Sequence, residues 1–495
     1  MNELVDQDAT VLAAKIASKD ISAEELMRAS LARIADVNGS VNAVVSLRDA
    51  DDCLADARAA DAGPSKGPLH GLPVAIKDLA NSEGLLTSMG SPIFANNIAQ
   101  KDDLMVARMK AAGAIVIGKT NTPEFGLGSH TFNPVHGVTR NPYDLTRSAG
   151  GSSGGAAVAL ATGMISIADG SDMMGSLRNP AAWNNVFGLR PTYGLVPLDM
   201  PGDMFHHQLA VAGPMGRTPK DVALLLDVQA GLDTRHPHSF EHVPASGQLD
   251  GDIKGMRFAW LGDWGGAYAM DAGVIETCEI ALRQFEAMGA NVDKIGAPFP
   301  AEQLWEAWVK LRAWANSCGK MALYENPETR AMLKDDAIWE IETGMALSAM
   351  EVHKMSLIRT QWFTKLNALF ADYDGVILPS AQVWPFPAEW DSPREIAGRT
   401  MDTYHRWMEV VIPASLVGVP ALNVPAGFGE MGLPMGLQIL GPRHSDAKLL
   451  RVGQRWHEAT AFSKNTPDLS KLKSELLFAP KCLEARMQCW RVWVA

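Results

Sequence analysis

The chain has 495 residues, of which 47% are hydrophobic and 20% are charged, a composition typical of a globular protein with a large buried core. Its formal net charge is −12, and an acidic chain without a run of basic residues is a poor ligand for phosphate backbones. These properties exclude a nucleic-acid partner from the expected functions.

Cysteine usage and hydropathy indicate a reducing compartment and no membrane. None of the cysteines forms a C-x-x-C pair, so neither a disulfide framework nor a zinc ribbon is expected; they are Cys53, Cys278, Cys318, Cys482 and Cys489. The acidic start of the chain does not resemble a signal peptide. Three prolines interrupt the most apolar segment, 410–425, which is therefore too broken to span a membrane. We expect a soluble, cytoplasmic protein.

The first part of the chain predicts alternating helices and strands. Residues 8–38 indicate two helices, the second of which begins with a capping box at Ser22 and ends at Asn38-Gly39. The short apolar run 72–76 predicts a strand with Lys77 at its end. An amphipathic helix over 103–112 and a β-branched strand over 114–117 follow.

The same alternation continues to residue 461. Further strands are predicted at 256–261, 373–378 and 437–440, with helices between them over 271–288 and 301–323. Such a pattern indicates one α/β domain around a mixed sheet, which we place at residues 1–461. Within it, residues 231–252 indicate a surface connection rich in His, Pro, Ser, Gly and Asp. Residues 462–495 form an atypical tail, which could dock on the body, form an interface or be a sequence artefact.

The loop Gly150-Gly151-Ser152-Ser153-Gly154-Gly155 has three interpretations. It could be a flexible surface loop, since glycine accepts many backbone conformations. It could cradle a phosphate, but no Gly-Lys-Ser/Thr follows. It could be a nucleophile elbow, which needs a strand directly before it, whereas residues 145–149 predict only a weak strand.

A second serine, in another glycine-containing turn, favours a catalytic interpretation of the loop. Ser176 follows Gly175 just before a predicted helix start at 177–182. Backbone N–H groups at a helix N-terminus suit the negative oxygen of a tetrahedral intermediate. A lysine that has lost its proton can activate a serine, and another serine can relay the proton. Lys77 and Ser152 are the candidates for these two roles.

With their surrounding motifs, Lys77, Ser152 and Ser176 resemble the amidase signature hydrolases. The resemblance extends from about residue 8 to about residue 460, and further matching segments occur at 118–126, 141–144, 187–194, 213–218, 418–422 and 432–438. It implies an α/β amidase signature fold, in which a central mixed β-sheet is flanked by helices on both faces.

The resemblance also implies a role for each site residue. Ser176 is the nucleophile, Ser152 is the bridging serine on a cis peptide after Gly151, and neutral Lys77 is the base. The backbone N–H groups that would form the oxyanion hole are those of Met173, Met174, Gly175 and Ser176. The family needs no metal or organic cofactor.

Other nearby residues are expected to support this triad. Ser153 would hold the loop by hydrogen bonds, and Asp172 with Arg178 would form a structural pair beside the nucleophile. His206-His207 lacks a third ligand with suitable spacing, so no metal site is predicted. Met174 replaces the first glycine of the family's usual Gly-Gly-Ser, and its side chain is expected to shape or shield the pocket.

The implied function is hydrolysis of a small, apolar or aromatic carboxamide or anilide to an acid and an amine or ammonia through an acyl-Ser176 intermediate. A carbamate or ester hydrolase with the same triad is an alternative, as is the glutamine-hydrolysing subunit of a tRNA amidotransferase. A non-catalytic scaffold and an α/β-hydrolase esterase that uses Ser153 and a histidine are more distant alternatives. The expected partner is a small-molecule amide, with no nucleic acid and no membrane; a homodimer stays open.

Overall fold

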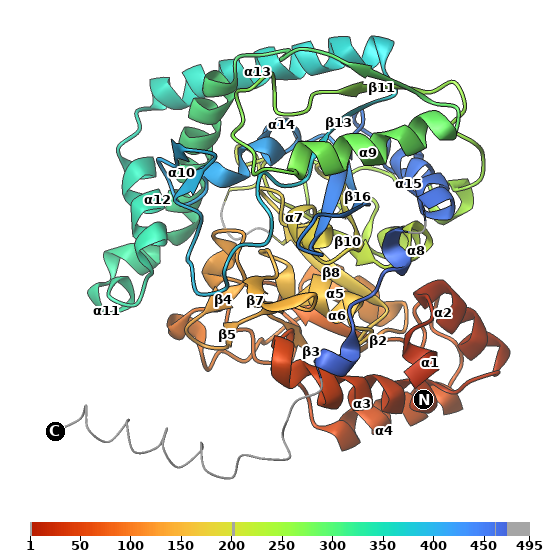
Figure 1. The fold of residues 1–495 in the computed structure, drawn as a ribbon. Helices are drawn as coiled ribbons and strands as arrows, with labels where there is room; N and C mark the ends of the chain where they lie inside the picture. The colour runs from red at the N-terminus through yellow and green to blue at the C-terminus, as the bar shows by residue number, and fades with distance from the viewer. Residues whose placement is uncertain (1, 200–202, 461, 473–495) are drawn as a thin grey trace.

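The computed structural model describes residues 2–199, 203–460 and 462–472 (Figure 1). The helices are α1 (Asn2–Val5), α2 (Ala9–Ser18), α3 (Ala23–Val41), α4 (Ala50–Ala62), α5 (Leu104–Ala111), α6 (Gly154–Ala161), α7 (Asn179–Trp183), α8 (Pro219–Gln229), α9 (Val274–Ala287), α10 (Ala301–Glu325), α11 (Pro327–Arg330), α12 (Asp335–Met345), α13 (Ala349–Asp372), α14 (Ile412–Val417) and α15 (Asp446–Thr460). The strands are β1 (Val44–Val45), β2 (Pro73–Lys77), β3 (Ile115–Thr120), β4 (Phe132–Asn133), β5 (Gly137–Val138), β6 (Arg140–Asn141), β7 (Asp144–Ser148), β8 (Ile167–Asp172), β9 (Phe187–Arg190), β10 (Val211–Gly216), β11 (Arg257–Trp260), β12 (Asn291–Lys294), β13 (Gly375–Pro379), β14 (Glu395–Ile396), β15 (Arg399–Thr400), β16 (Ala421–Phe428) and β17 (Pro434–Leu440).

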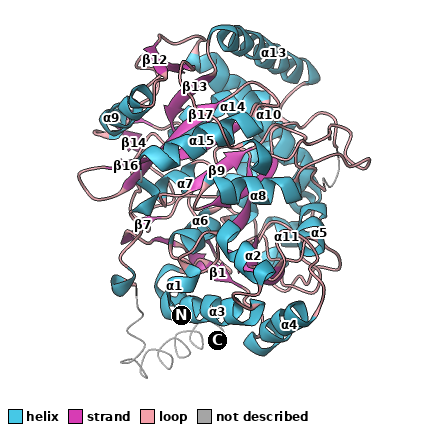
Figure 2. Cartoon of the chain, turned by 90° about the vertical axis from the view of Figure 1, so that its right-hand side faces the viewer, coloured by secondary structure: helices cyan, strands magenta, loops and turns pink. Residues whose placement is uncertain are grey.

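An eight-stranded mixed sheet forms the centre of the molecule (Figure 2). Its strand order is β12-β11-β13-β17-β16-β9-β10-β8. β11 pairs in parallel with β12 and β13, and the remaining neighbours pair antiparallel. Every residue of β9, β10, β13 and β17 is buried. Because successive residues of a strand face opposite sides of the sheet, both faces of this sheet are covered.

A smaller sheet places the lysine next to the edge of the large one. Its order is β1-β3-β2, and β2 pairs in parallel with β3. β2 in turn lies beside β8, and the Lys77 backbone N–H donates to Asp169 Oδ1 on β8 over 3.1 Å. This junction brings the end of β2 to the middle of β8.

The predicted α/β class and mixed sheet are confirmed, with a correction to one helix end. The capping box at Ser22 is present, but α3 passes Asn38-Gly39 and ends only at Val41, followed by the cap residue Asn42 in a left-handed conformation (φ 53°). The extension buries Val41 completely, which offsets the modest cost of a glycine inside a helix. The weak strand predicted at 145–149 is present as β7 (Asp144–Ser148), which pairs with β6.

The beginning of the predicted tail packs on the body. The Phe462 ring lies 6.0 Å from that of Trp456 between centroids, and the Tyr143 hydroxyl donates to the Asn465 carbonyl over 2.7 Å. Residues 473–495 lie outside the described residues. The domain boundary at 461 stays a prediction.

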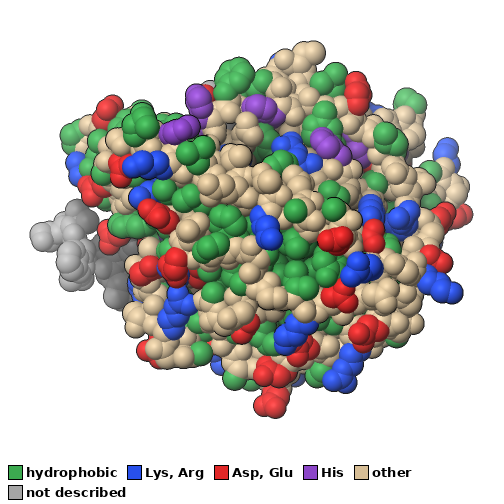
Figure 3. Space-filling view, turned by 90° about the horizontal axis from the view of Figure 1, so that it is seen from above, with side chains coloured by type: hydrophobic (Ala, Val, Ile, Leu, Met, Phe, Trp, Pro, Cys, Tyr) green, Lys and Arg blue, Asp and Glu red, His purple; other side chains and the backbone are tan. Residues whose placement is uncertain are grey.

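The apolar segment 410–425 is part of the core. It contains α14 and the first half of β16, all buried. Within the described part of the chain, no helix has the length and apolar character that a membrane crossing requires. On the face seen in Figure 3, acidic and basic side chains are interspersed with apolar ones.

We predict that Gly155→Ala destabilises the protein. A Cβ at this position would lie 2.3 Å from the Asn121 backbone N and 2.6 Å from the Ala43 carbonyl oxygen, and backbone atoms cannot move aside cheaply. We expect the free energy of unfolding to fall by about 1–3 kcal/mol, measured by urea denaturation. Gly247→Ala is the matched control, because no atom lies within 4 Å of its Cβ. Equal stability of the two variants would contradict this packing argument.

Candidate active site

Lys77 ends β2 with its amine enclosed by serine oxygens. Its Nζ lies 2.8 Å from Ser152 Oγ, 2.8 Å from Ser153 Oγ and 3.0 Å from Ser171 Oγ. The residue is 1% exposed, and among the described residues no carboxylate forms an ion pair with the amine. The predicted Lys77–Ser152 contact is therefore present.

This environment favours the neutral amine. Burial lowers the pKa of Lys77 to about 7, although the charges of Asp169 and Asp172 partly oppose the shift. Hydroxyl oxygens solvate an ammonium less well than water does, and they do not neutralise it. A substantial fraction of Lys77 can consequently act as a base near neutral pH.

The Ser152 loop is held from both sides. The Gly151–Ser152 peptide is cis, as the family resemblance implies. The Ser129 hydroxyl donates to the Gly151 carbonyl over 2.5 Å, and the Thr131 hydroxyl donates to the Gly150 carbonyl over 2.8 Å. α6 begins directly after the loop at Gly154. The glycine-rich segment is thus a buried, hydrogen-bonded turn rather than a flexible surface loop.

Ser176 lies in the turn that joins β8 to α7. Gly175 has a φ of 81°, and a Cβ there would lie 2.9 Å from the Val411 side chain. Both the backbone conformation and the space therefore require glycine before Ser176. Ser176 is 6% exposed and lies with Ser152 in the wall of one cavity. No hydrogen bond joins the two hydroxyl groups in this structure.

The carboxylate of Asp172 fixes the turn that contains Ser176. It accepts hydrogen bonds from the backbone N–H groups of Gly175 (2.9 Å) and Leu177 (3.1 Å). It also forms ion pairs with Arg178 (3.0 Å) and Arg190 (3.1 Å), and all three side chains are fully buried. Burial alone would raise the pKa of Asp172, but the two guanidinium groups outweigh it and keep that pKa well below its usual range. The expected Asp172–Arg178 pair is therefore present and includes a second arginine.

The predicted oxyanion donors differ in availability. The Gly175 N–H is engaged by Asp172, whereas those of Met173, Met174 and Ser176 form no hydrogen bond within the described part of the chain. Three backbone donors near the nucleophile thus remain free to bind an oxygen atom, and the oxyanion role of this turn stays a prediction.

A cavity of about 130 Å³ lies over the two serines. Apart from the serines, its wall is mostly apolar and includes Leu79, Phe125, Leu127, Met173, Met174, Ala210 and Met408. Two polar side chains from α10, Arg312 and Asn316, complete the lining. A second cavity of about 130 Å³ contains Lys77 and Asp169, and Ser171 lines both.

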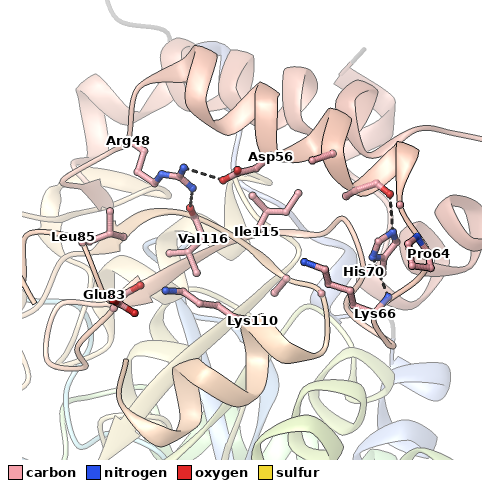
Figure 4. A pocket seen from close by; sticks show the side chains of 17 residues that line it. Arg48, Asp56, Pro64, Lys66, His70, Glu83, Leu85, Lys110, Ile115 and Val116 are labelled. Carbon is pink, nitrogen blue, oxygen red and sulfur yellow. Dashed lines mark hydrogen bonds and ion pairs between the residues drawn. The ribbon is translucent and has the colours of Figure 1, made fainter. Parts of the chain in front are cut away.

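Another cavity, of about 570 Å³, lies away from these residues (Figure 4). It is lined by parts of α4, α5 and β3, and none of the predicted site residues contributes to it. Of its charged side chains, Arg48 pairs with Asp56 at 2.8 Å and Lys110 pairs with Asp102 at 2.6 Å, and His70 Nε2 donates to the Ala60 carbonyl over 3.1 Å. It has no nucleophile and base in contact, so it is not the candidate active site.

The histidine-based alternatives gain no support from the geometry. His206 and His207 lie against Trp314, with ring centroids 5.8 and 4.3 Å away. Within residues 2–199, 203–460 and 462–472, no three His, Cys, Asp or Glu side chains are placed to hold a metal ion. Ser153 contacts Lys77 and Ser171, and no histidine hydrogen-bonds to it in the described structure. This arrangement disfavours an esterase that uses Ser153 and a histidine.

Comparison with known proteins agrees with this site. The family model described as Amidase matches residues 25–450. The chain belongs to the amidase signature family. It is 35% identical to an acylamidase of Rhodococcus erythropolis, over 93% of this chain and 96% of that protein. It is also 32% identical to a glutamyl-tRNA(Gln) amidotransferase subunit of Lactiplantibacillus plantarum, over 93% and 98% of the two chains. A bacterial aryl acylamidase structure matches with a TM-score of 0.87, 27% identity and coverage of 95% and 98%.

Membership of this family makes the chain a hydrolase of amide C–N bonds. Sequence reasoning overlooked three residues at the site, namely Ser171, Arg190 and Arg312. Ser171 and Arg190 lie in or beside segments that carry the family resemblance, so position alone could have indicated them. Arg312 belongs to α10, and no sequence pattern connects that helix with the serines.

We predict that Asp172→Asn strongly destabilises the protein. The change leaves two buried guanidinium groups without their counter-charge, so we expect the free energy of unfolding to fall by about 3–5 kcal/mol. The control Asp293→Asn removes the partner of Arg257 from an ion pair in which the side chains are 48% and 41% exposed, and should cost at most about 1 kcal/mol. Thermal and urea unfolding would measure both. If Asp172→Asn left the free energy of unfolding almost unchanged, the assignment of this carboxylate as the charged centre of the turn would be wrong.

Proposed function

We propose that the enzyme hydrolyses a small, apolar or aromatic carboxamide or anilide through an acyl-Ser176 intermediate. The observation that carries this proposal is the buried Lys77 amine in hydrogen-bond contact with Ser152, which shares a cavity with Ser176. The apolar wall of that cavity suits an alkyl or aryl group. The names of the acylamidase and aryl acylamidase relatives support the same substrate class.

In the first half-reaction, neutral Lys77 takes the proton of the Ser152 hydroxyl, and Ser152 takes that of Ser176. The Ser176 oxygen bonds to the amide carbon, and the carbonyl oxygen becomes an oxyanion near the free N–H groups of Met173, Met174 and Ser176. We expect the Ser152–Ser176 hydrogen bond to form when substrate fills the cavity, since catalytic contacts often tighten on binding.

Collapse of the intermediate breaks the C–N bond. The proton held by Lys77 returns through Ser152 to the nitrogen, so a neutral amine or ammonia leaves and Ser176 carries the acyl group. Water then attacks the ester carbon and gives its proton to the same relay. The carboxylic acid is released and Ser176 regains its hydroxyl group.

The amidotransferase alternative is less well supported. A relative of that name is 32% identical, but the described lining of the cavity contains no Asp or Glu side chain that could bind the ammonium group of glutamine. Carbamates and esters remain within reach of the same triad. We further propose, on the scattered cysteines, a cytoplasmic enzyme with a small-molecule partner; its oligomeric state stays open.

We predict that Ser176→Ala lowers kcat for hydrolysis of an aryl anilide by at least about 1000-fold, because the hydroxyl group that would accept the acyl group is missing. A fluorophosphonate probe should label the native enzyme at Ser176, as determined by peptide mapping, and should not label the variant. Ser153→Ala is the matched control and should keep the label at Ser176. Labelling at Ser153 with Ser176→Ala still active would overturn the assignment.

We predict that kcat/KM falls as the pH drops below about 7. The pKa of Lys77 is lowered to about 7, so acidification converts the base to an ammonium group that cannot accept a proton. Below this pKa the rate should fall about tenfold per pH unit. Lys77→Met should remove activity at every pH, while the control Lys310→Met, which removes an ion pair with Glu306 on α10, should keep the native profile. A value of kcat/KM that does not change between pH 5 and 8 would contradict the neutral-lysine base.

A further inference from the structure

Two hydrogen-bond donors from α10 face the catalytic cavity. Arg312 and Asn316 are one helical turn apart, so they lie on the same side of the helix. Both line the cavity that contains Ser152 and Ser176, and they are only 3% and 5% exposed. Figure 1 shows α10 among the helices beside the large sheet, far in sequence from the serines.

The Arg312 guanidinium is anchored on one side and free on the other. Its Nε donates to Glu340 Oε1 over 2.6 Å, and its Nη2 donates to the Tyr404 hydroxyl over 2.7 Å. Within the part of the chain that the structure describes, its Nη1 has as hydrogen-bond partners only the sulfur atoms of Met173 (3.8 Å) and Met174 (4.0 Å). Thioether sulfur is a weak acceptor, so the hydrogen-bonding capacity of Nη1 is largely unused.

Asn316 presents a second unused donor. Its Oδ1 accepts a hydrogen bond from Lys320 Nζ over 2.8 Å, which orients the amide. Its Nδ2 is buried and has no hydrogen-bond partner in the described structure. A buried amide donor without a partner costs free energy that a ligand oxygen would recover.

The charge around this pair is positive. Glu340 balances Arg312, but within the described residues Lys320 has no carboxylate at ion-pair distance. Burial lowers the pKa of Lys320 to about 8, helped by Arg312 and opposed by Glu340, so the amine is still mostly charged at neutral pH. An anion beside Arg312 and Asn316 would balance this charge.

We propose that Arg312 Nη1 and Asn316 Nδ2 together bind a carboxylate carried by the amide substrate. This inference rests on the proposed amidase function and specifies its substrate. The substrate would have an apolar middle part that contacts the methionine and leucine side chains. Its amide would reach Ser176 at one end, and its carboxylate would reach α10 at the other. Two donors from one helix face match the two oxygens of a carboxylate.

The test compares the native enzyme on matched 4-nitroanilides. The mono-4-nitroanilides of succinic, glutaric and adipic acid carry the carboxylate at increasing distance. Each is compared with two neutral analogues, in which a terminal carboxamide or an isopropyl group replaces the carboxylate. For the best chain length, we expect kcat/KM to be about 10–100-fold higher for the acid than for either analogue.

The variant Asn316→Asp tests the residue directly. It keeps the shape and an oxygen for Lys320, but it replaces the free donor by an acceptor that repels a carboxylate. The ratio of kcat/KM for the acid to that for the isopropyl analogue should fall at least about tenfold. Asn291→Asp, which adds the same charge at an exposed position of β12, should leave the ratio unchanged.

The outcomes separate this inference from the proposed function. Equal turnover of acid and isopropyl analogue by the native enzyme would overturn the carboxylate site while leaving the amidase function intact. Preference for the carboxamide over the acid would overturn it too, and so would an unchanged ratio in an Asn316→Asp enzyme that still reacts with the fluorophosphonate. No hydrolysis of any anilide, with no label on Ser176, would instead refute the proposed function. The comparison on the native enzyme does not depend on whether the variant folds.

Discussion

The burial of one amine governs the arrangement of this site. Lys77 lies at the junction of two sheets, where β2 ends beside β8, and among the described residues its Nζ forms hydrogen bonds only with serine oxygens. A carboxylate in contact would stabilise the ammonium and remove the base, whereas an apolar pocket would leave the amine without partners. Hydroxyl groups avoid both problems, since they give the amine hydrogen-bond partners but carry no negative charge that would stabilise the ammonium form. The Asp169 carboxylate close by binds the Lys77 backbone N–H instead of the amine.

The second constraint is that the turn around Ser176 must keep its shape without hydrogen bonds from Lys77 or Ser152. Asp172 ends β8 and binds two N–H groups of the turn, while Arg178 from the turn and Arg190 from β9 hold the carboxylate. One charge thus connects two strands and the start of α7. The Asp172 carboxylate also accepts the hydrogen bond of the Gly175 N–H, so that this group is not available to a ligand in the cavity. The turn therefore uses one of its N–H groups for its own structure, and the N–H groups of Met173, Met174 and Ser176 form no hydrogen bond within the described part of the chain.

The sequence could predict the parts of this site that local motifs encode. Apolar runs located β2, β3 and β13, and glycines beside serines located both turns, because chain neighbours determine these features. The paired burial of Arg190 with Asp172, and the contact of Ser171 with Lys77, depend on strand register, which no short motif specifies. Arg312 could not be predicted from the sequence at all, because α10 comes close to the serines only through tertiary packing. In helix α3 a local motif gave the wrong end. Asn38-Gly39 normally indicates the end of a helix, but α3 continues to Val41, which is buried.

Met174 connects the departure from the family pattern with the wall of the cavity. The family usually has glycine here, and the methionine side chain extends to α10, where its sulfur accepts from Trp308 Nε1 over 3.1 Å and lies 4.0 Å from Arg312 Nη1. A glycine would leave space beside the guanidinium for a water molecule, whose oxygen is a strong hydrogen-bond acceptor. The thioether fills that space with a weak acceptor, so Arg312 keeps its donor capacity while the wall stays apolar. Met174 thereby leaves Arg312 Nη1, in the wall of the cavity that contains Ser176, with weak sulfur acceptors among the described residues.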